Sequence, residues 1–123
     1  MSFPVYSRRL HEPVPAGGTI ESAHRIAVVE GNYLLVDEDP WKRFRQLFHL
    51  RVFVSAGVEA LVEGLRERHL RGGKTPEATE RYIREVDLPN ARRVGPSSVH
   101  AQAFVHKADV RRIDRIEWVV PFQ

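Results

Sequence analysis

The residues that most constrain the fold are 26–29, an apolar run of isoleucine, alanine and two valines with no polar residue in it. Uninterrupted runs of this kind are typical of strands buried on both faces of a parallel sheet. Glu30 ends the run, and Gly31 leads into a second apolar stretch, residues 32–36. We therefore expect a buried strand within residues 25–36 and, around it, a sheet covered on both faces.

Two helices with a glycine break follow in the middle of the chain. Apolar residues recur at helical spacing over residues 58–70, and Gly72-Gly73 ends this helix. Thr75 is expected to cap the next helix, Pro76 fits its first position, and Pro89 is expected to end it.

Shorter elements complete the expected order. We expect a short helix that begins at Asp39-Pro40, with Asp39 as its cap, and strands near residues 50–54, 103–106 and 116–120. Residues 1–24 are expected to be irregular because prolines and Gly17-Gly18 interrupt them. Strands that alternate with helices predict an α/β fold.

Composition limits the classes of function. The chain has 123 residues, enough for one domain, and a net charge of +3, too small to indicate nucleic-acid binding by itself. It has no cysteine, which excludes a disulfide framework and a thiolate metal site. No apolar run approaches the roughly 18 residues needed to cross a bilayer, and no signal sequence is evident. We expect a cytoplasmic protein that does not bind a membrane. Nucleic-acid binding through the basic tail is the weakest alternative, and its residues would be Lys107, Arg111, Arg112 and Arg115.

Glu30 is the first candidate for chemistry. Ligands of open α/β sheets sit beyond the carboxyl ends of the strands, and an acid there can hold magnesium directly or through water. From the residue alone, a solvated glutamate at a strand end is the more common case.

A basic turn, residues 66–74, is the second candidate. Arginines on two helices beside a glycine hinge can close over an anionic ligand, because the guanidinium fork matches phosphate oxygens. The pattern also fits a solvated helix face with a glycine cap. The candidate cations are Arg66, Arg68, Arg71 and Lys74.

The opening segment offers a third, weaker candidate. Tyr6, Arg8 and His11 could contact a substrate hydroxyl or phosphate, although a frayed terminus has the same composition. Other classes lack their motifs: the chain has no G-x-S-x-G elbow, no histidine spacing for a metal, and no G-x-x-x-x-G-K-[ST] phosphate loop.

Five segments in order resemble the uridine kinase, phosphoribulokinase and pantothenate kinase group of P-loop kinases. They are P-V-Y-S-R-R-L-H-E-P-V (4–14), V-V-E-G-N-Y-L-L (28–35), D-E-D-P-W (37–41), R-E-R-H-L-R-G-G-K-T-P-E (66–77) and D-L-P-N-A (87–91). The resemblance covers roughly residues 3–94. Ser7 stands where the group usually has aspartate, and the phosphate loop and the early catalytic aspartate have no counterpart here.

The resemblance implies a role for each matched segment. Glu30 would be the catalytic acid at the magnesium site. The basic-turn cations would bind the phosphates of ATP, with Asn90 and Ala91 near the adenine, and Tyr6, Arg8 and His11 would line the acceptor pocket. The implied fold is part of a three-layer, parallel-sheet P-loop NTPase with a helical lid, its N-terminal strands and phosphate loop lacking.

The resemblance also implies a division of the chain as one partial domain. Residues 1–24 would form an acceptor-side loop, 25–56 the magnesium-side strand and the next strand, 57–88 the lid helices, and 89–123 a C-terminal segment. The whole enzyme would transfer a phosphoryl group from ATP to a hydroxyl of a nucleoside, sugar or pantothenate-like acceptor.

Without the phosphate loop, this chain alone is expected to be inactive, so whether it is itself an enzyme stays open. The alternative is a catalytically dead nucleotide-binding or protein-interaction module. An exposed sheet edge is also expected to favour self-association.

Overall fold

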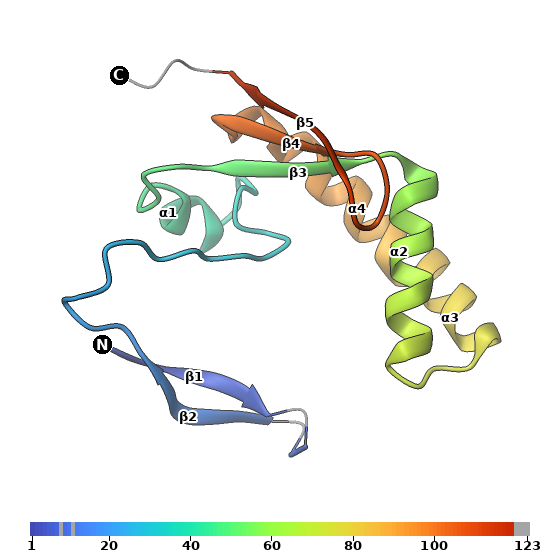
Figure 1. Ribbon diagram of the computed structural model, residues 1–123, viewed down its shortest axis with the longest axis horizontal. Helices are drawn as coiled ribbons and strands as arrows, with labels where there is room; N and C mark the ends of the chain where they lie inside the picture. The colour runs from blue at the N-terminus through green and yellow to red at the C-terminus, as the bar shows by residue number, and fades with distance from the viewer. Residues whose placement is uncertain (8, 11, 120–123) are drawn as a thin grey trace. The chain divides into compact units, whose positions relative to one another are not determined.

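A computed structural model describes residues 1–7, 9–10 and 12–119. The chain divides into two units, Met1–Glu30 and Gly31–Gln123. Figure 1 traces both units along the chain. No helix among the described residues is long and apolar enough to cross a membrane.

The first unit is a β-hairpin followed by an extended segment. β1 (Ser2–Ser7) pairs antiparallel with β2 (Glu12–Thr19), so the expectation of an irregular start is wrong. Prolines are tolerated here because each strand has a free edge, where no N–H is needed. Gly18 permits close packing, since a Cβ there would lie 2.3 Å from the ring of Phe3.

The strand expected within residues 25–36 is absent. Residues 25–30 are exposed and pair with no described strand, and residues 32–35 form turns in the second unit. Val28 has 89% of its surface exposed. A strand satisfies its backbone groups only through a neighbour, and apolar composition alone does not supply one.

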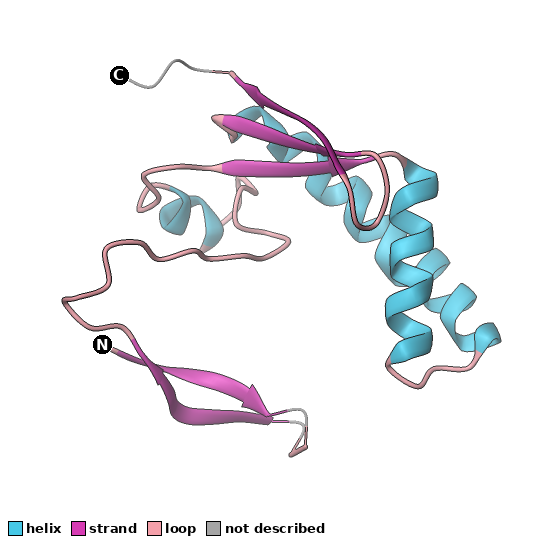
Figure 2. Ribbon diagram, viewed as in Figure 1, coloured by secondary structure: helices cyan, strands magenta, loops and turns pink. Residues whose placement is uncertain are grey.

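The second unit contains a mixed three-stranded sheet in the order β3-β4-β5. β3 (Val52–Ala56) runs parallel to β4 (Ala103–Lys107), and β5 (Ile113–Trp118) runs antiparallel to β4. The three strands lie side by side in Figure 2. The α/β class is therefore confirmed. The expectation of a parallel sheet is wrong for β5, which is antiparallel to its neighbour. Residue 120, the end of the last expected strand, lies outside the described residues.

Helices make up the connection between β3 and β4. α2 (Val58–Arg71) matches the expected helix, and Gly72 and Gly73 separate it from α3 (Pro76–Tyr82). The chain then continues through a π-helical turn, η1 (Ile83–Asp87), into α4 (Leu88–Val94) and a 3₁₀ turn, η2 (Gly95–His100). In Figure 1, α2 and α3 extend beyond the end of β3 as a helical pair.

Two expected helix boundaries are wrong. Pro89 does not end the helical segment, which continues through α4. An interior proline normally clashes with the carbonyl four residues earlier, and the wider π-helical turn just before Pro89 changes that hydrogen-bonding pattern. Asp39 does not cap α1 (Trp41–Arg45): Pro40 precedes the helix, and the carboxylate of Asp39 instead accepts a hydrogen bond from Arg43 at 3.2 Å.

The buried core of the second unit is small. Its buried apolar side chains are Leu35, Val36, Ile83, Ala101 and Ala103. Among polar side chains, His69, Thr79 and Ser97 are also buried. Of these residues, His69 lies beside the basic turn, and Val36 and Ser97 line the pocket described next.

Candidate functional site

The basic turn has the local structure that its sequence predicts. The backbone N–H of Ala78 donates to the hydroxyl of Thr75 at 3.2 Å, which caps α3. Gly73 adopts φ of +91°, a conformation that glycine reaches without steric cost. A helix, a glycine hinge and a capped second helix are therefore all present.

The four predicted cations of this turn differ in how they are held. Arg66 binds Glu80 of α3 through two hydrogen bonds of 2.5 and 3.1 Å, and Arg71 pairs with Glu67 on its own helix. The hydrogen bond from Arg66 lowers the pKa of the Glu80 carboxyl below its usual value.

Lys74 and Arg68 are the two cations of the turn without an acidic partner among the described residues. The ammonium of Lys74 lies 4.8 Å from the centre of the Tyr82 ring, a cation–π contact. Arg68 is exposed on α2. No carboxylate of the described residues competes for either cation, and Lys74 is held by the Tyr82 ring, so Arg68 is the cation most available to an anionic ligand.

A largely buried histidine–carboxylate pair joins α2 to η1. Nε2 of His69 lies 2.7 Å from Oδ2 of Asp87, and their side chains are only 10% and 14% exposed. The His69 ring also packs edge-on against Tyr82, with centroids 5.1 Å apart. Because Tyr82 contacts both His69 and Lys74, it connects the histidine–carboxylate pair to a cation of the basic turn.

A second cluster brings together segments that the sequence separates by more than fifty residues. The hydroxyl of Tyr33 donates to Oδ1 of Asn90 at 2.9 Å, and the guanidinium of Arg93 lies 5.3 Å from the Tyr33 ring centre. Arg93 also binds Glu38 at 2.7 Å, and Tyr33 packs near Trp41. We call these five residues, Tyr33, Glu38, Trp41, Asn90 and Arg93, the Tyr33 cluster; it joins the G-N-Y-L-L and D-L-P-N-A segments. Ala91, the other predicted nucleotide-side residue, is half-buried.

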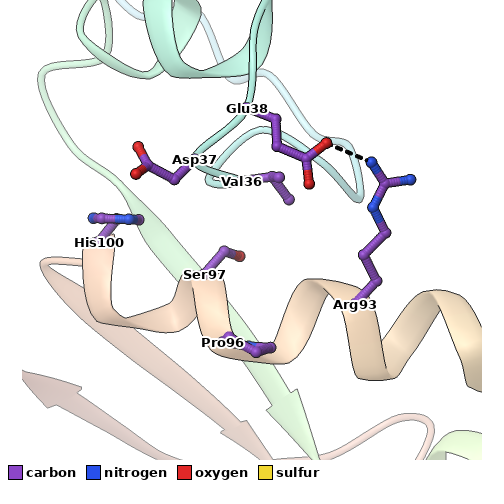
Figure 3. A pocket seen from close by; sticks show the side chains of 7 residues that line it. All are labelled: Val36, Asp37, Glu38, Arg93, Pro96, Ser97 and His100. Carbon is purple, nitrogen blue, oxygen red and sulfur yellow. Dashed lines mark hydrogen bonds and ion pairs between the residues drawn. The ribbon is translucent and has the colours of Figure 1, made fainter.

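A pocket of about 220 Å³ lies beside the Tyr33 cluster. In Figure 3 the loop at 36–38 forms one wall and the α4–η2 helix the other, with the Glu38–Arg93 pair at one end. A hydrogen bond from Arg45, and then the charge of Lys42, lower the pKa of the Asp37 carboxyl at this wall. The lining residues are Val36, Asp37, Glu38, Arg93, Pro96, Ser97 and His100.

The other predicted residues belong to the first unit, Met1–Glu30. Glu30 and Tyr6 are exposed in the first unit, and Arg8 and His11 lie outside the described residues. Across the described ranges, no three histidine or acidic side chains are grouped closely enough to hold a metal ion.

Sequence reasoning missed Arg93, Glu38 and the His69–Asp87 pair. Arg93 could have been found, since it lies three residues after Asn90 and so on the same helix face. The partners of His69 and Glu38 are 18 and 55 residues away, and no local pattern indicates them.

Comparison with known proteins supports a kinase-like relationship. The chain is 34% identical over 109 residues to the ATP-dependent kinase YFH7 of Lachancea thermotolerans, which covers 83% of this chain and 31% of that protein. It is 28% identical over 104 residues to the ATP-dependent kinase-like protein notR' of Aspergillus versicolor, 83% of this chain and 60% of the relative. Similarity to proteins with these names indicates a kinase-like chain.

A bacterial relative and two negative comparisons complete this result. The uncharacterized protein YggC of Escherichia coli strain K12 is 30% identical over 111 residues, 90% of this chain and 46% of that protein. The chain thus spans between about a third and three fifths of the length of these relatives. No family model matches the chain, and no solved structure does.

Proposed function

We propose that this chain is the lid-bearing part of an ATP-dependent small-molecule kinase of the uridine kinase-like group. The observation that carries the proposal is the basic turn: a glycine hinge between α2 and the capped helix α3, with Arg68 exposed and without an acidic partner among the described residues. The relatives named as ATP-dependent kinases support the same function.

The phosphates of ATP are the proposed ligand of the basic turn. Arg68 and Lys74 would bind first, because neither has to leave a carboxylate. Arg66 would have to leave Glu80, and Arg71 would have to leave Glu67, before either could bind phosphate oxygens. Arginine suits this exchange because its planar fork donates two parallel hydrogen bonds to either group.

The other matched residues take the roles that the resemblance implies. Asn90 and Ala91 would lie on the nucleotide-base side, and Tyr6, Arg8 and His11 on the acceptor side. Glu30 would help to hold magnesium, which neutralises phosphate charge when it is bound. The reaction would transfer the γ-phosphoryl group of ATP to a hydroxyl of a nucleoside, sugar or pantothenate-like acceptor.

Phosphate binding by this chain alone is proposed to be weak and turnover absent. Phosphoryl transfer depends on backbone N–H groups and a lysine that cradle the β- and γ-phosphates, and the sequence contains no phosphate-loop motif. A nucleotide-binding or interaction module without catalysis is therefore the second candidate function.

The first experiment is a titration of the purified chain with ATP and magnesium by calorimetry at low salt. Arg68→Ala is expected to weaken binding by about tenfold or more, because a hydrogen bond to a charged group contributes roughly 1.5–3 kcal/mol. Arg84→Ala is the matched control: Arg84 pairs with its neighbour Glu85 on the exposed surface, and its loss removes the same charge. Equal weakening by both variants would reduce the effect to net charge and contradict the proposed site.

A second experiment asks whether the chain turns over ATP by itself. ATP consumption is measured with a panel of nucleosides, sugars and pantothenate as acceptors. Binding without consumption is the result expected of this chain, both as part of a kinase and as a nucleotide-binding module. Acceptor-dependent consumption that Glu30→Gln abolishes would contradict the module without catalysis, and absence of ATP binding at low salt would contradict both nucleotide-binding proposals and leave only the interaction module.

A further inference from the structure

Three side chains from three adjacent strands form a hydrogen-bonded series on the sheet. Oγ of Ser55 on β3 lies 2.7 Å from Nδ1 of His106 on β4, and Nε2 of His106 lies 3.0 Å from Oε2 of Glu117 on β5. None of these residues belongs to the basic turn or to the Tyr33 cluster. The group therefore needs an account of its own.

Strand register explains why the three side chains meet. Ser55 lies directly opposite His106 in the parallel pair, and His106 lies opposite Arg115 in the antiparallel pair. Glu117 is two residues beyond Arg115, so it points to the same face as Arg115 and His106. Ser55 and His106 are also the second-to-last residues of their strands, near the carboxyl ends where open α/β sheets bind ligands.

The hydrogen bonds fit one tautomer of His106. If Nε2–H donates to the Glu117 carboxylate, Nδ1 carries a lone pair and accepts from the Ser55 hydroxyl. Glu117 then fixes the orientation of the ring, and the ring stands as a base beside a hydroxyl. A nucleophile, a base and a group that orients the base are the parts of an activated-serine site.

Aromatic rings border the serine on the same face. Phe53 and Phe104 are 5.9 Å apart between centroids, and Phe104 stacks on His106 at 5.8 Å with planes 10° apart. The stacking holds the imidazole plane in place. The ring faces also offer an apolar surface to a small acyl or aryl group beside Ser55.

We propose that Ser55 is an activated nucleophile that accepts acyl groups from small aryl esters. Oγ forms a bond to the ester carbonyl carbon while its proton passes to Nδ1 of His106; the aryl oxygen then leaves and takes that proton. Water attacks the acyl-serine in the same way, releasing a carboxylic acid and restoring Ser55. Arg115, in register with His106, lies 3.8 Å from Oε2 of Glu117 and so adjoins the carboxylate that orients the ring.

The test uses the whole chain with a fluorophosphonate probe, which labels activated serines, and with p-nitrophenyl acetate. We expect labelling of Ser55, identified by mass spectrometry, and release of p-nitrophenol. Ser55→Ala is expected to abolish both. Ser22→Ala, at an exposed position outside the group, is the matched control and is expected to change neither.

Variants of the other members separate a catalytic role from a structural one. His106→Ala is expected to slow labelling by about a hundredfold, the usual contribution of a positioned base. Glu117→Ala is expected to slow labelling less than His106→Ala does, and Glu117→Asp is expected to restore part of the labelling rate. Urea unfolding of each variant checks that it is folded. Labelling of wild type no faster than of Ser55→Ala, or unchanged by His106→Ala, would overturn the proposal. Because the lid plays no part in this test, its result is independent of the proposed kinase function.

Discussion

Of the contacts between a basic and an acidic side chain among the described residues, the one between His69 and Asp87 is the least exposed, and its loss should be costly. His69→Ala would leave the Asp87 carboxylate without a partner in a position only 14% exposed. We expect the free energy of unfolding to fall by about 1–3 kcal/mol, the usual cost of an unsatisfied buried acceptor. Urea denaturation measures this change in the free energy of unfolding. His49→Ala is the control, because His49 is exposed and its loss should change the stability little.

Asp37 gives a prediction of acid sensitivity. Its folded-state pKa is lowered, first by the hydrogen bond from Arg45, so its stabilising contribution is present above the ordinary value of 3.8. That contribution is lost as the pH falls through the lowered folded-state pKa. Asp37→Asn should therefore be less stable than wild type at neutral pH, and the difference should shrink on acidification. A constant difference from neutral pH to acid, in denaturation curves, would contradict this assignment.

Single residues were predictable where their partners are close in sequence. Thr75 caps a helix three residues away, and Pro76 begins that helix, as the sequence predicts. The partner of Arg66 is Glu80, fourteen residues away across the glycine hinge, and the partner of Tyr33 is Asn90. These pairs depend on how helices pack, which no local pattern encodes.

At the scale of elements, the glycine hinge can be tested with a matched pair of substitutions. Gly73→Ala should destabilise the chain by about 1–2 kcal/mol, because alanine is strained at φ of +91°. Gly64 lies inside α2, where a Cβ would meet only the side chain of Val110 at 3.4 Å, so Gly64→Ala should stabilise by about 0.5–1 kcal/mol. Opposite signs in thermal unfolding confirm the hinge conformation, and equal signs contradict it.

Elements with a strong local period were predicted well, and those that depend on pairing were not. α2 was expected at residues 58–70 and spans Val58–Arg71, and β3 was expected at 50–54 and spans Val52–Ala56. The hairpin of β1 and β2 was missed because its prolines suggested irregular chain. Pro89 was wrongly taken as a helix end because a π-helical turn has no simple sequence signal.

At the scale of the whole molecule, the α/β class followed from alternating elements, but the sheet did not. The antiparallel placement of β5 and the free edge of β3 are properties of pairing between distant strands. Residues 26–29 carry the composition of a central strand, yet they have no described partner. Composition indicates what a segment can pair with, and only the fold decides whether it does.

Hydrogen exchange measured by mass spectrometry tests this last point directly. Amides of residues 26–30 should exchange at the rate of an unstructured peptide, because no described residue bonds them, whereas those of β4, paired on both sides, should be protected. Trypsin should also cut early after Arg25. Protection of 26–30 at low protein concentration would restore the strand expected from the sequence and contradict the exposed segment. Protection that grows with concentration would instead show pairing with a second copy, the self-association expected from the sequence.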